Sequence, residues 1–367
     1  MLHTRADLGR AAARVDAGAQ SSTAGWARLV ANRHSQASWR ARPQAVVYRG
    51  AGTPDNSSIL FNDVHAAYQN ALRWRMDQTV ANGDAARDIL NAWSATLTRV
   101  DGNADRFLAA GIQGYQFANA AELMRGYPGF NLDRFQTMML TAFYPLNDSF
   151  LTNHNGAFIT NYWANWDLMT IASVLAIGIL VDDQAKIDRA VTYFLSGPGN
   201  GSLPNAVPVV HNDGTAQWIE AGRDQGHATL GVGLMAAICE MAWNQGIDLY
   251  GALDNRFMRG AEYVAKYNLG QEVPYTSYTW HKGAPGVWSG WETFTAASPA
   301  SRGTIRPIWA MIYNHYARRR NLPCPNIEAM AALVGTEGGG GDYGPNSGGY
   351  DQLGFGTLMN TADAQSR

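Results

Sequence analysis

Apolar side chains recur at the spacing of an α-helix through most of this sequence. Residues 63–74, for example, place Val64, Tyr68 and Leu72 on one helical face. The same pattern predicts helices over 63–74, 85–97, 106–124, 132–143, 161–180, 184–194, 228–243, 255–267 and 307–319. Strand-like alternation is almost absent, and residues 45–48 and 207–210 are the only short candidates. The chain is therefore expected to be all-α.

Glycine and proline punctuate the helices, as in residues 127–129, 197–201 and 283–286. Short loops without heptads predict antiparallel helix pairs that close on themselves as an incomplete (α/α) toroid or barrel. A helical solenoid is the alternative, but no fixed period emerges. Because no linker is visible, we expect one domain. Its predicted parts are an irregular N-terminal segment packed on the barrel (1–55) and the toroid with a Gly-rich C-terminal wrap (56–367).

Composition and charge exclude several classes of protein. The 367 residues are 46% hydrophobic, enough for a large core. A net charge of -2 argues against nucleic-acid binding, which needs clustered Lys and Arg. No apolar run reaches the roughly 18 to 20 residues of a membrane span, so 169–181 is interpreted as a buried helix. We expect no membrane partner, and a monomer or weak homo-oligomer.

The first seven residues contain no apolar core of a signal peptide. We expect a secreted protein whose signal peptide is not in this sequence, with an intact cytoplasmic chain as the alternative. Cys239 and Cys324 allow a disulfide, but two buried thiols fit equally well. Two cysteines cannot form a thiolate zinc site, and no His-x-x-x-His or Glu-rich ligand set appears. No metal or other cofactor is expected.

Polar residues crowd the start of the apolar run 228–243. Glu220, Arg223 and His227 are spaced i, i+3 and i+7 on one stripe. Arginine offers a planar fork that matches a carboxylate, and histidine exchanges a proton near neutral pH. The alternative is an intrahelical Glu–Arg pair beside a hydrogen-bonded histidine, and Asp224 and Gln225 are compatible with both interpretations.

A second group combines amides with aromatic rings. Asn161 and Asn165 share a helical face, with Trp163 and Trp166 interleaved. Amides can hydrogen-bond a carboxylate or a hydroxyl, and the flat apolar faces of sugars stack on aromatic rings. The alternative is helix capping and core packing, which asparagine and tryptophan also perform.

A third group lies in residues 301–316 and contains Arg302, Arg306 and Tyr313. Pro307 suits a first helical turn, so Tyr313, two turns later, lies on roughly the same side as Arg306. An adjacent arginine stabilises an ionised tyrosine, which can then act as a base or acid. Tyr313, His315 and Tyr316 are equally compatible with packing on an amphipathic helix.

Residues 161–167, 220–227 and 306–316 resemble the alginate-lyase-like superfamily, and most closely polysaccharide lyase family 38, whose members cleave alginate or glucuronan. The resemblance runs from about residue 62 to the C-terminus, and Gly-Arg-Asp-Gln-Gly-His (222–227) is its most specific part. Better-known members of the superfamily carry an adjacent Asn-His pair followed by a tryptophan. Alignment on Trp166 places Tyr162 and Trp163 where that pair would be, so its catalytic histidine is not carried over.

The resemblance implies an (α/α) toroid and β-elimination on a uronic acid, with no cofactor. The C6 carboxylate must be neutralised, the C5 proton removed and the leaving O4 protonated. We assign neutralisation to Asn165 with Arg223 or Arg306, and take Tyr313 as first candidate for base and for acid. His227 is the competing base or a third carboxylate partner. The residues expected to bind the acidic polysaccharide are Asn161, Trp163, Trp166, His154, Asn155, Gln225, Glu220, Arg302, His315 and Trp280.

Two other functions remain open at this point. An (α/α)-barrel glycoside hydrolase would need two carboxylates across a cleft, with Asp167, Glu220, Asp224 and Glu292 as possible members. A non-catalytic protein that binds acidic glycans on a lyase scaffold is the third reading. The residues do not distinguish glucuronan from alginate or polymannuronate, nor endo from exo action.

Overall fold

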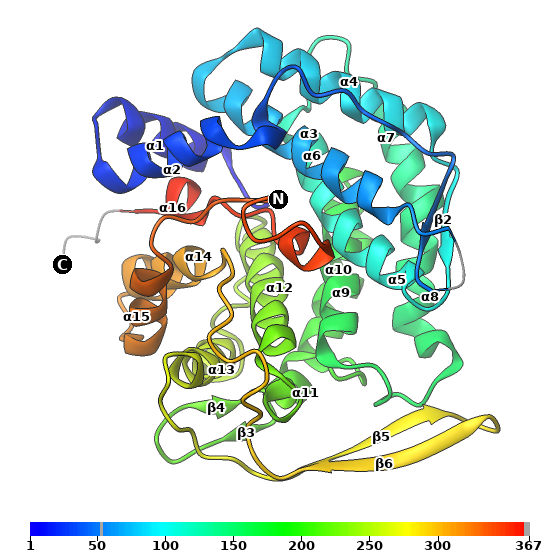
Figure 1. Ribbon diagram of the computed structural model, residues 1–367, viewed down its shortest axis with the longest axis vertical. Coiled ribbons are helices and arrows are strands. Elements are labelled where there is room, and N and C mark those ends of the chain that lie inside the picture. The colour runs from blue at the N-terminus through cyan, green and yellow to red at the C-terminus, as the bar shows by residue number, and fades with distance from the viewer. Residues whose placement is uncertain (52–53, 363–367) are drawn as a thin grey trace.

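Four helices that contact one another in chain order form the inner wall of the molecule (Figure 1). They are α3 (Ser57–Asp77), α6 (Gly114–Leu123), α9 (Ala164–Leu180) and α12 (Gln225–Trp243). An outer layer packs on them, with α4 (Val80–Thr96) on α3, α10 (Gln184–Ser196) on α9 and α13 (Ala252–Asn268) on α12. This computed structural model describes residues 1–51 and 54–362. The two helical layers form an incomplete (α/α) toroid in a single domain, as the sequence predicts.

The nine predicted long helices are all present, several with a π-helical turn inside. Three of the predicted segments contain the short helices α5 (Arg106–Leu108), α7 (Leu132–Met138) and α14 (Trp309–Tyr313). The other helices are α1 (Arg5–Asp16), α2 (Gln20–Ala31), α8 (Tyr144–Asn153), α11 (Leu203–Ala206), α15 (Pro325–Val334) and α16 (Gly356–Met359). The π-helical turns are Ala109–Gln113, Met139–Phe143 and Asn314–Arg319, and the 3-10 turns are Arg33–Ser35, His154–Gly156, Ile219–Gly222 and Ser347–Tyr350.

The inner helices are apolar on almost every side. Every residue of α9 is buried except Trp166, because its neighbours α6, α8, α10 and α12 surround it. A helix that is hydrophobic all round belongs in a core, which confirms the buried-helix interpretation of residues 169–181. Within the described part of the chain, no helix combines the length and apolarity needed to cross a membrane. Cys239 and Cys324 are both free and buried.

The N-terminal segment differs from the expected irregular structure, since it contains α1 and α2. A local signal for α1 was present in the sequence: Thr4 accepts from the backbone N–H of Asp7, whose carboxylate accepts from the backbone N–H of Thr4. Helix α1 packs on α3, while α2 packs on α16, which contacts α14. The two ends of the chain therefore bridge the first inner helix and α14, where the toroid is incomplete (Figure 1).

The short strands predicted at 45–48 and 207–210 are confirmed. They correspond to β1 (Val46–Arg49), parallel to β2 (Arg99–Gly102), and to β3 (Val209–Val210), antiparallel to β4 (Ala216–Gln217). The sequence reasoning missed a longer antiparallel hairpin of β5 (Tyr278–Ala284) and β6 (Trp288–Phe294). This hairpin extends from the helical body as an arm (Figure 1).

The buried carboxylate of Asp63 on α3 ties the N-terminal segment to the toroid. It accepts hydrogen bonds from the indole N–H of Trp39 (2.9 Å), the indole N–H of Trp93 (2.8 Å) and the backbone N–H of Arg42 (2.7 Å). Three donors from two separate segments thus converge on one side chain that is inaccessible to water.

Asp63→Ala is expected to lower the free energy of unfolding by about 3 kcal/mol, because one buried and two partly buried donors lose their acceptor. Urea denaturation measures this change. The control is Asp188→Ala, which removes an exposed carboxylate that accepts one bond from Gln184. Equal effects of the two substitutions would contradict an anchoring role for Asp63.

Candidate active site

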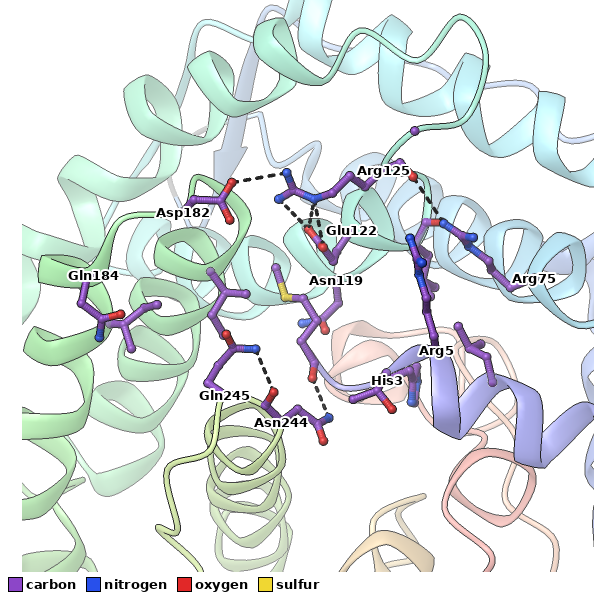
Figure 2. Close-up of a pocket in the computed structure, with 17 residues that line it drawn as sticks. His3, Arg5, Arg75, Asn119, Glu122, Arg125, Asp182, Gln184, Asn244 and Gln245 are labelled. Atoms are coloured by element: carbon purple, nitrogen blue, oxygen red, sulfur yellow. Dashed lines mark hydrogen bonds and ion pairs between the residues drawn. The ribbon is translucent and has the colours of Figure 1, made fainter.

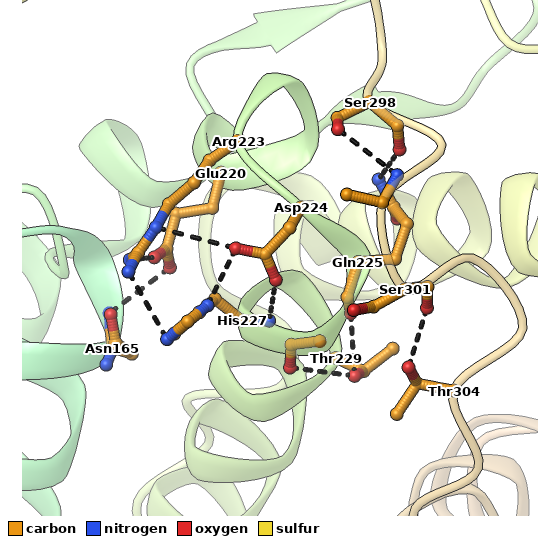
Figure 3. A network of polar contacts seen from close by, with 12 residues as sticks. Asn165, Glu220, Arg223, Asp224, Gln225, His227, Thr229, Ser298, Ser301 and Thr304 are labelled. Atoms are coloured by element: carbon orange, nitrogen blue, oxygen red, sulfur yellow. Dashed lines mark hydrogen bonds and ion pairs between the residues drawn. The ribbon is translucent and has the colours of Figure 1, made fainter.

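Charged and polar side chains converge where α9 and α12 begin (Figure 3). Glu220 lies on the 3-10 turn Ile219–Gly222, and Arg223 and Asp224 connect this turn to α12. His227 lies in the first turn of α12, and Asn165 in the first turn of α9. We refer to these five residues as the polar cluster. Because helix N-termini carry partial positive charge, their meeting favours a negatively charged ligand.

The Glu220 side chain is fully buried and joins the two helix starts. Its Oε1 accepts from Nη1 of Arg223 at 3.0 Å, and its Oε2 accepts from the backbone N–H of Asn165 at 3.3 Å. Burial raises the pKa of Glu220 to about 7, against the opposing effect of the charges on Arg223 and His227. The carboxyl group is therefore partly protonated near neutral pH.

Asp224 orients His227 through both carboxylate oxygens. Its Oδ1 caps α12 by accepting from the backbone N–H of His227 (2.8 Å), and its Oδ2 lies 2.7 Å from the ring Nδ1. Burial raises the pKa of Asp224, but the bonds from His227 and the charges of His227 and Arg223 outweigh burial and lower it. A carboxylate at Nδ1 places the ring proton there, so Nε2 carries the lone pair in the neutral ring. That Nε2 lies 3.3 Å from Nη2 of Arg223.

The side-chain oxygen of Asn165 is buried without a hydrogen-bond partner among the described residues. Asn165 is 2% exposed, and no polar atom contacts its Oδ1. Leaving a buried polar group unpaired costs about 1–3 kcal/mol, and such groups call for an explanation in a native structure. A ligand hydroxyl could donate to this oxygen, and a ligand carboxylate could accept from the side-chain N–H₂ group of the same amide.

An aromatic wall, formed largely by the hairpin, flanks the polar cluster. Trp163 is 5% exposed, and its ring lies 5.6 Å from the guanidinium carbon of Arg223. It packs on Trp280 (centroids 4.5 Å apart) and on Tyr278 (6.1 Å). Burial and the negative charge of Glu220 raise the pKa of Tyr278 to about 12. Sequence reasoning missed Tyr278, although the alternation of Tyr278 and Trp280 before a Pro-Gly turn is typical of a strand in a hairpin.

Gly222, the first residue of the Gly-Arg-Asp-Gln-Gly-His motif, allows the base of the hairpin to pack closely against the turn before α12. A Cβ at this position would lie 2.2 Å from the Tyr275 hydroxyl and 2.6 Å from the Cβ of Phe294. No side chain fits in that space, so Tyr275 and Phe294 at the base of the hairpin lie directly against the turn that carries Glu220.

Tyr313, His315 and Arg302, three of the expected site residues, are engaged by residues that do not belong to the polar cluster. Tyr313 donates to Oε1 of Glu328 on α15 at 3.0 Å, and burial and this bond raise its pKa. His315 is buried against Tyr250 with ring centroids 3.6 Å apart, and burial and the charge of Arg319 lower its pKa to about 3. It also contacts Trp243 at the far end of α12, about 24 Å from His227 at 1.5 Å per residue.

Arg302 is likewise an expected site residue that is engaged elsewhere in the protein. It donates to the backbone oxygens of Tyr267 and Gln271 and to the carboxylate of Glu272. Helical spacing alone therefore did not reveal what these three side chains face.

Other predicted residues border the cluster and hold its surroundings. Arg306 lies beside the start of α12, where it donates to the Gly226 backbone oxygen (3.2 Å) and to Oδ2 of Asp351 (2.9 Å). Gln225 is buried and donates to the backbone oxygens of Ala221 and Ser298.

The remaining predicted residues lie in the segment before α9 and, for Trp166, in the first turn of α9. His154 is buried, with Nε2 2.8 Å from Oδ1 of Asp167, and Asn155 donates to the Tyr162 hydroxyl. Trp166 packs on Tyr162 with ring centroids 4.6 Å apart. Asn161 accepts from the backbone N–H of Gly283 and so fixes the hairpin.

A pocket of about 650 Å³ lies at the opposite end of the toroid (Figure 2). Arg125 and Arg75 line it, but Arg125 is paired with Glu122 and Asp182, and Arg75 donates to the Leu123 backbone oxygen. Two of the three arginines that line it, Arg75 and Arg125, are thus engaged by the protein, unlike the side-chain oxygen of Asn165.

Comparisons of the sequence and of the structure with known proteins both find alginate lyases. A family model described as alginate lyase matches residues 19–273. An alginate lyase structure from Bacteroides ovatus aligns over 99% of this chain and 99% of its own, with a TM-score of 0.64 and 11% identity. A histidine-to-alanine variant of alginate lyase A1-III, complexed with a tetrasaccharide, aligns over 93% and 94%, with a TM-score of 0.59 and 14% identity. At these identities the two structures show a shared fold. No curated protein matches the chain.

The pKa of Glu220 predicts how stability depends on pH. A glutamate in the unfolded chain has a pKa near 4.5, whereas the folded value is about 7. Between these values the folded state retains a proton that the unfolded state has released, so the free energy of unfolding falls as pH rises. The expected loss is about 3 kcal/mol between pH 4.5 and 7. Urea denaturation at pH 5 and pH 8 should show this loss in the wild type and a smaller one in Glu220→Gln. Equal losses would contradict the assignment.

Proposed function

The chain belongs to the alginate lyase family, and on that premise we propose that it cleaves a 1,4-linked polyuronate by β-elimination, leaving a 4,5-unsaturated uronate end. As a member of this family it is a polysaccharide lyase. The substrates that we propose are glucuronan and alginate or polymannuronate. The observation that carries the proposal is the unpaired, buried side-chain oxygen of Asn165 beside the Glu220–Arg223 pair, with His227 next to Arg223. Action on such a polymer also agrees with the secreted location expected from the sequence.

Neutralisation of the C6 carboxylate is the first requirement of the reaction. The C5 proton becomes acidic only when the negative charge that develops on the carboxylate is stabilised. Arg223 supplies a cation held by Glu220, and the Nδ2 group of Asn165 supplies N–H donors that can meet the carboxylate. Since the pKa of Glu220 is about 7, its carboxyl group only partly offsets the charge of Arg223 near neutral pH. Arg223 Nε also lies 3.5 Å from Oδ2 of Asp224, so the guanidinium offers a uronate directed N–H donors rather than a net positive charge of the cluster.

His227 is the proposed base. Its Nε2 carries the lone pair, and Asp224 both fixes the ring and stabilises the imidazolium that forms when the C5 proton is taken. Its side chain is 41% exposed, so a bound sugar can reach it. Arg223 lies next to Nε2 and can hold the carboxylate while His227 removes the neighbouring proton.

Tyr278 replaces Tyr313 as the proposed acid. With a pKa of about 12, its hydroxyl stays protonated at neutral pH and suits donation to the leaving O4 better than proton removal. Tyr278 packs near Trp163, and the negative charge of Glu220 contributes to its raised pKa. The hydroxyl of Tyr313 instead donates a hydrogen bond to Glu328, outside the polar cluster.

The glycoside hydrolase alternative needs two carboxylates free to act across a cleft. Asp167 is buried and accepts from Tyr193 and the backbone N–H of Gly201, with His154 also in hydrogen-bond contact. Glu220 and Asp224 are held by Arg223 and His227. Because these three carboxylates are already bound by protein groups, the arrangement favours the lyase over the hydrolase.

Incubation with glucuronan, alginate and pectate tests the reaction. Elimination produces a conjugated uronate, so ultraviolet absorbance should rise with glucuronan or alginate. No rise on any polyuronate, together with new reducing ends on a neutral glycan, would indicate a hydrolase. Binding to a polyuronate with neither product would indicate a non-catalytic protein.

His227→Ala and Tyr278→Phe are each expected to lower kcat on the cleaved polyuronate by about 10²- to 10⁴-fold, since each removes a proton-transfer group. Tyr313→Phe is the matched control, because it deletes a tyrosine hydroxyl outside the polar cluster and should leave kcat almost unchanged. Steady-state absorbance assays of the three variants measure this. Inactivity of Tyr313→Phe with full activity of Tyr278→Phe would reverse the assignment.

A further inference from the structure

We propose that one face of the β5–β6 hairpin binds the polyuronate beyond the polar cluster, which makes a long chain a better substrate than a short oligosaccharide. The inference rests on the proposed function and extends its site. We call this face the hairpin track; it comprises Tyr278, Trp280, Lys282, Trp288 and Glu292.

The hairpin is fixed to the loop that leads into α9. Gly283 accepts from the backbone N–H of Phe158 (2.9 Å) and donates to Oδ1 of Asn161 (2.7 Å). The Trp280 indole donates to the backbone oxygen of Thr160 at 2.6 Å. These bonds attach β5 to the loop on the side that does not pair with β6. They therefore define the orientation of the hairpin relative to the polar cluster.

The hairpin track continues directly from the polar cluster. Arg223 lies over Trp163, Trp163 packs on Trp280, and Nζ of Lys282 lies 5.5 Å from the centre of the Trp280 ring. Trp288 pairs with Ala284 at the far end and is 57% exposed. Alternation along the strands places these residues on one face, and six steps from Tyr278 to Ala284 span about 20 Å.

The chemistry of the hairpin track suits a uronate chain. Aromatic rings stack on the apolar faces of sugars, and Lys282, the only Lys or Arg in residues 278–294, can meet a carboxylate. Lys282 is now paired with Glu292 at 3.0 Å, and both side chains are more than a third exposed. An exposed pair of this kind is weak, so a substrate carboxylate can replace Glu292 as the partner of Lys282.

The opposite face of the hairpin provides an internal control. There His281 stacks between Phe158 (4.0 Å) and Trp291 (4.1 Å). Trp291 is 70% exposed, more than Trp288, yet the alternation of β6 turns it away from the hairpin track. Two exposed tryptophans on one hairpin thus differ in the face that they occupy.

The experiment compares Trp288→Ala with Trp291→Ala, using the polyuronate that the wild type cleaves and its tetrasaccharide. Trp288→Ala is expected to lose about threefold to tenfold in kcat/KM on the polymer, in line with the loss of one stacking contact, and less than twofold on the tetrasaccharide. Trp291→Ala should change less than twofold on both. Trp288→Tyr should retain most of the polymer activity, because it keeps a ring. Glu292→Gln should lower KM for the polymer by about twofold to threefold by freeing Lys282.

Two results separate the possible failures. With an active wild type, equal kcat/KM of Trp288→Ala and Trp291→Ala on the polymer, or equal loss by Trp288→Ala on polymer and tetrasaccharide, would overturn the hairpin track. A wild type that forms no unsaturated product from any polyuronate would instead overturn the proposed function and the track with it. Thermal unfolding midpoints show whether each variant is folded, and Trp288→Tyr keeps the comparison decisive if Trp288→Ala unfolds.

Discussion

The buried contact between Glu220 and Arg223 determines how the rest of the polar cluster is arranged. It connects the entrance of α12 to the start of α9, because the same carboxylate also accepts from the backbone N–H of Asn165. Burying a charged pair has a desolvation cost that its attraction often fails to recover, so such a pair is weak evidence for stability alone. Here it holds a guanidinium, an unpaired amide and an imidazole at one place. That arrangement is suited to binding a carboxylate next to a base.

The local backbone explains why these side chains meet. The 3-10 turn Ile219–Gly222 ends before α12, and Asp224 caps the new helix while it holds the ring of His227. Gly222 leaves room for the base of the hairpin, which brings aromatic rings to the same place. One short motif thus fixes the cation, the base and the approach of the arm.

The sequence predicted the helical architecture well, because the 3.6-residue period is a local property of each segment. It expected Glu220, Arg223 and His227 on one helical stripe with a Glu–Arg pair as the alternative; the three side chains do meet, but Glu220 lies on a 3-10 turn and Asp224 is extended, so no single helix carries them. It failed where distant segments meet. Tyr278 reaches the cluster through hairpin pairing and the anchoring loop, and Tyr313 faces Glu328 because of how α14 packs on α15. The helical period of a segment specifies neither of these partners.

The most direct test of the account is a crystal structure of His227→Ala with a tetrasaccharide of the cleaved polyuronate. We expect one C6 carboxylate within hydrogen-bond distance of the Arg223 guanidinium and the Asn165 amide, with C5 facing the space left by the imidazole. A sugar bound beside Tyr313 and Glu328, or a carboxylate that contacts neither Arg223 nor Asn165, would contradict it.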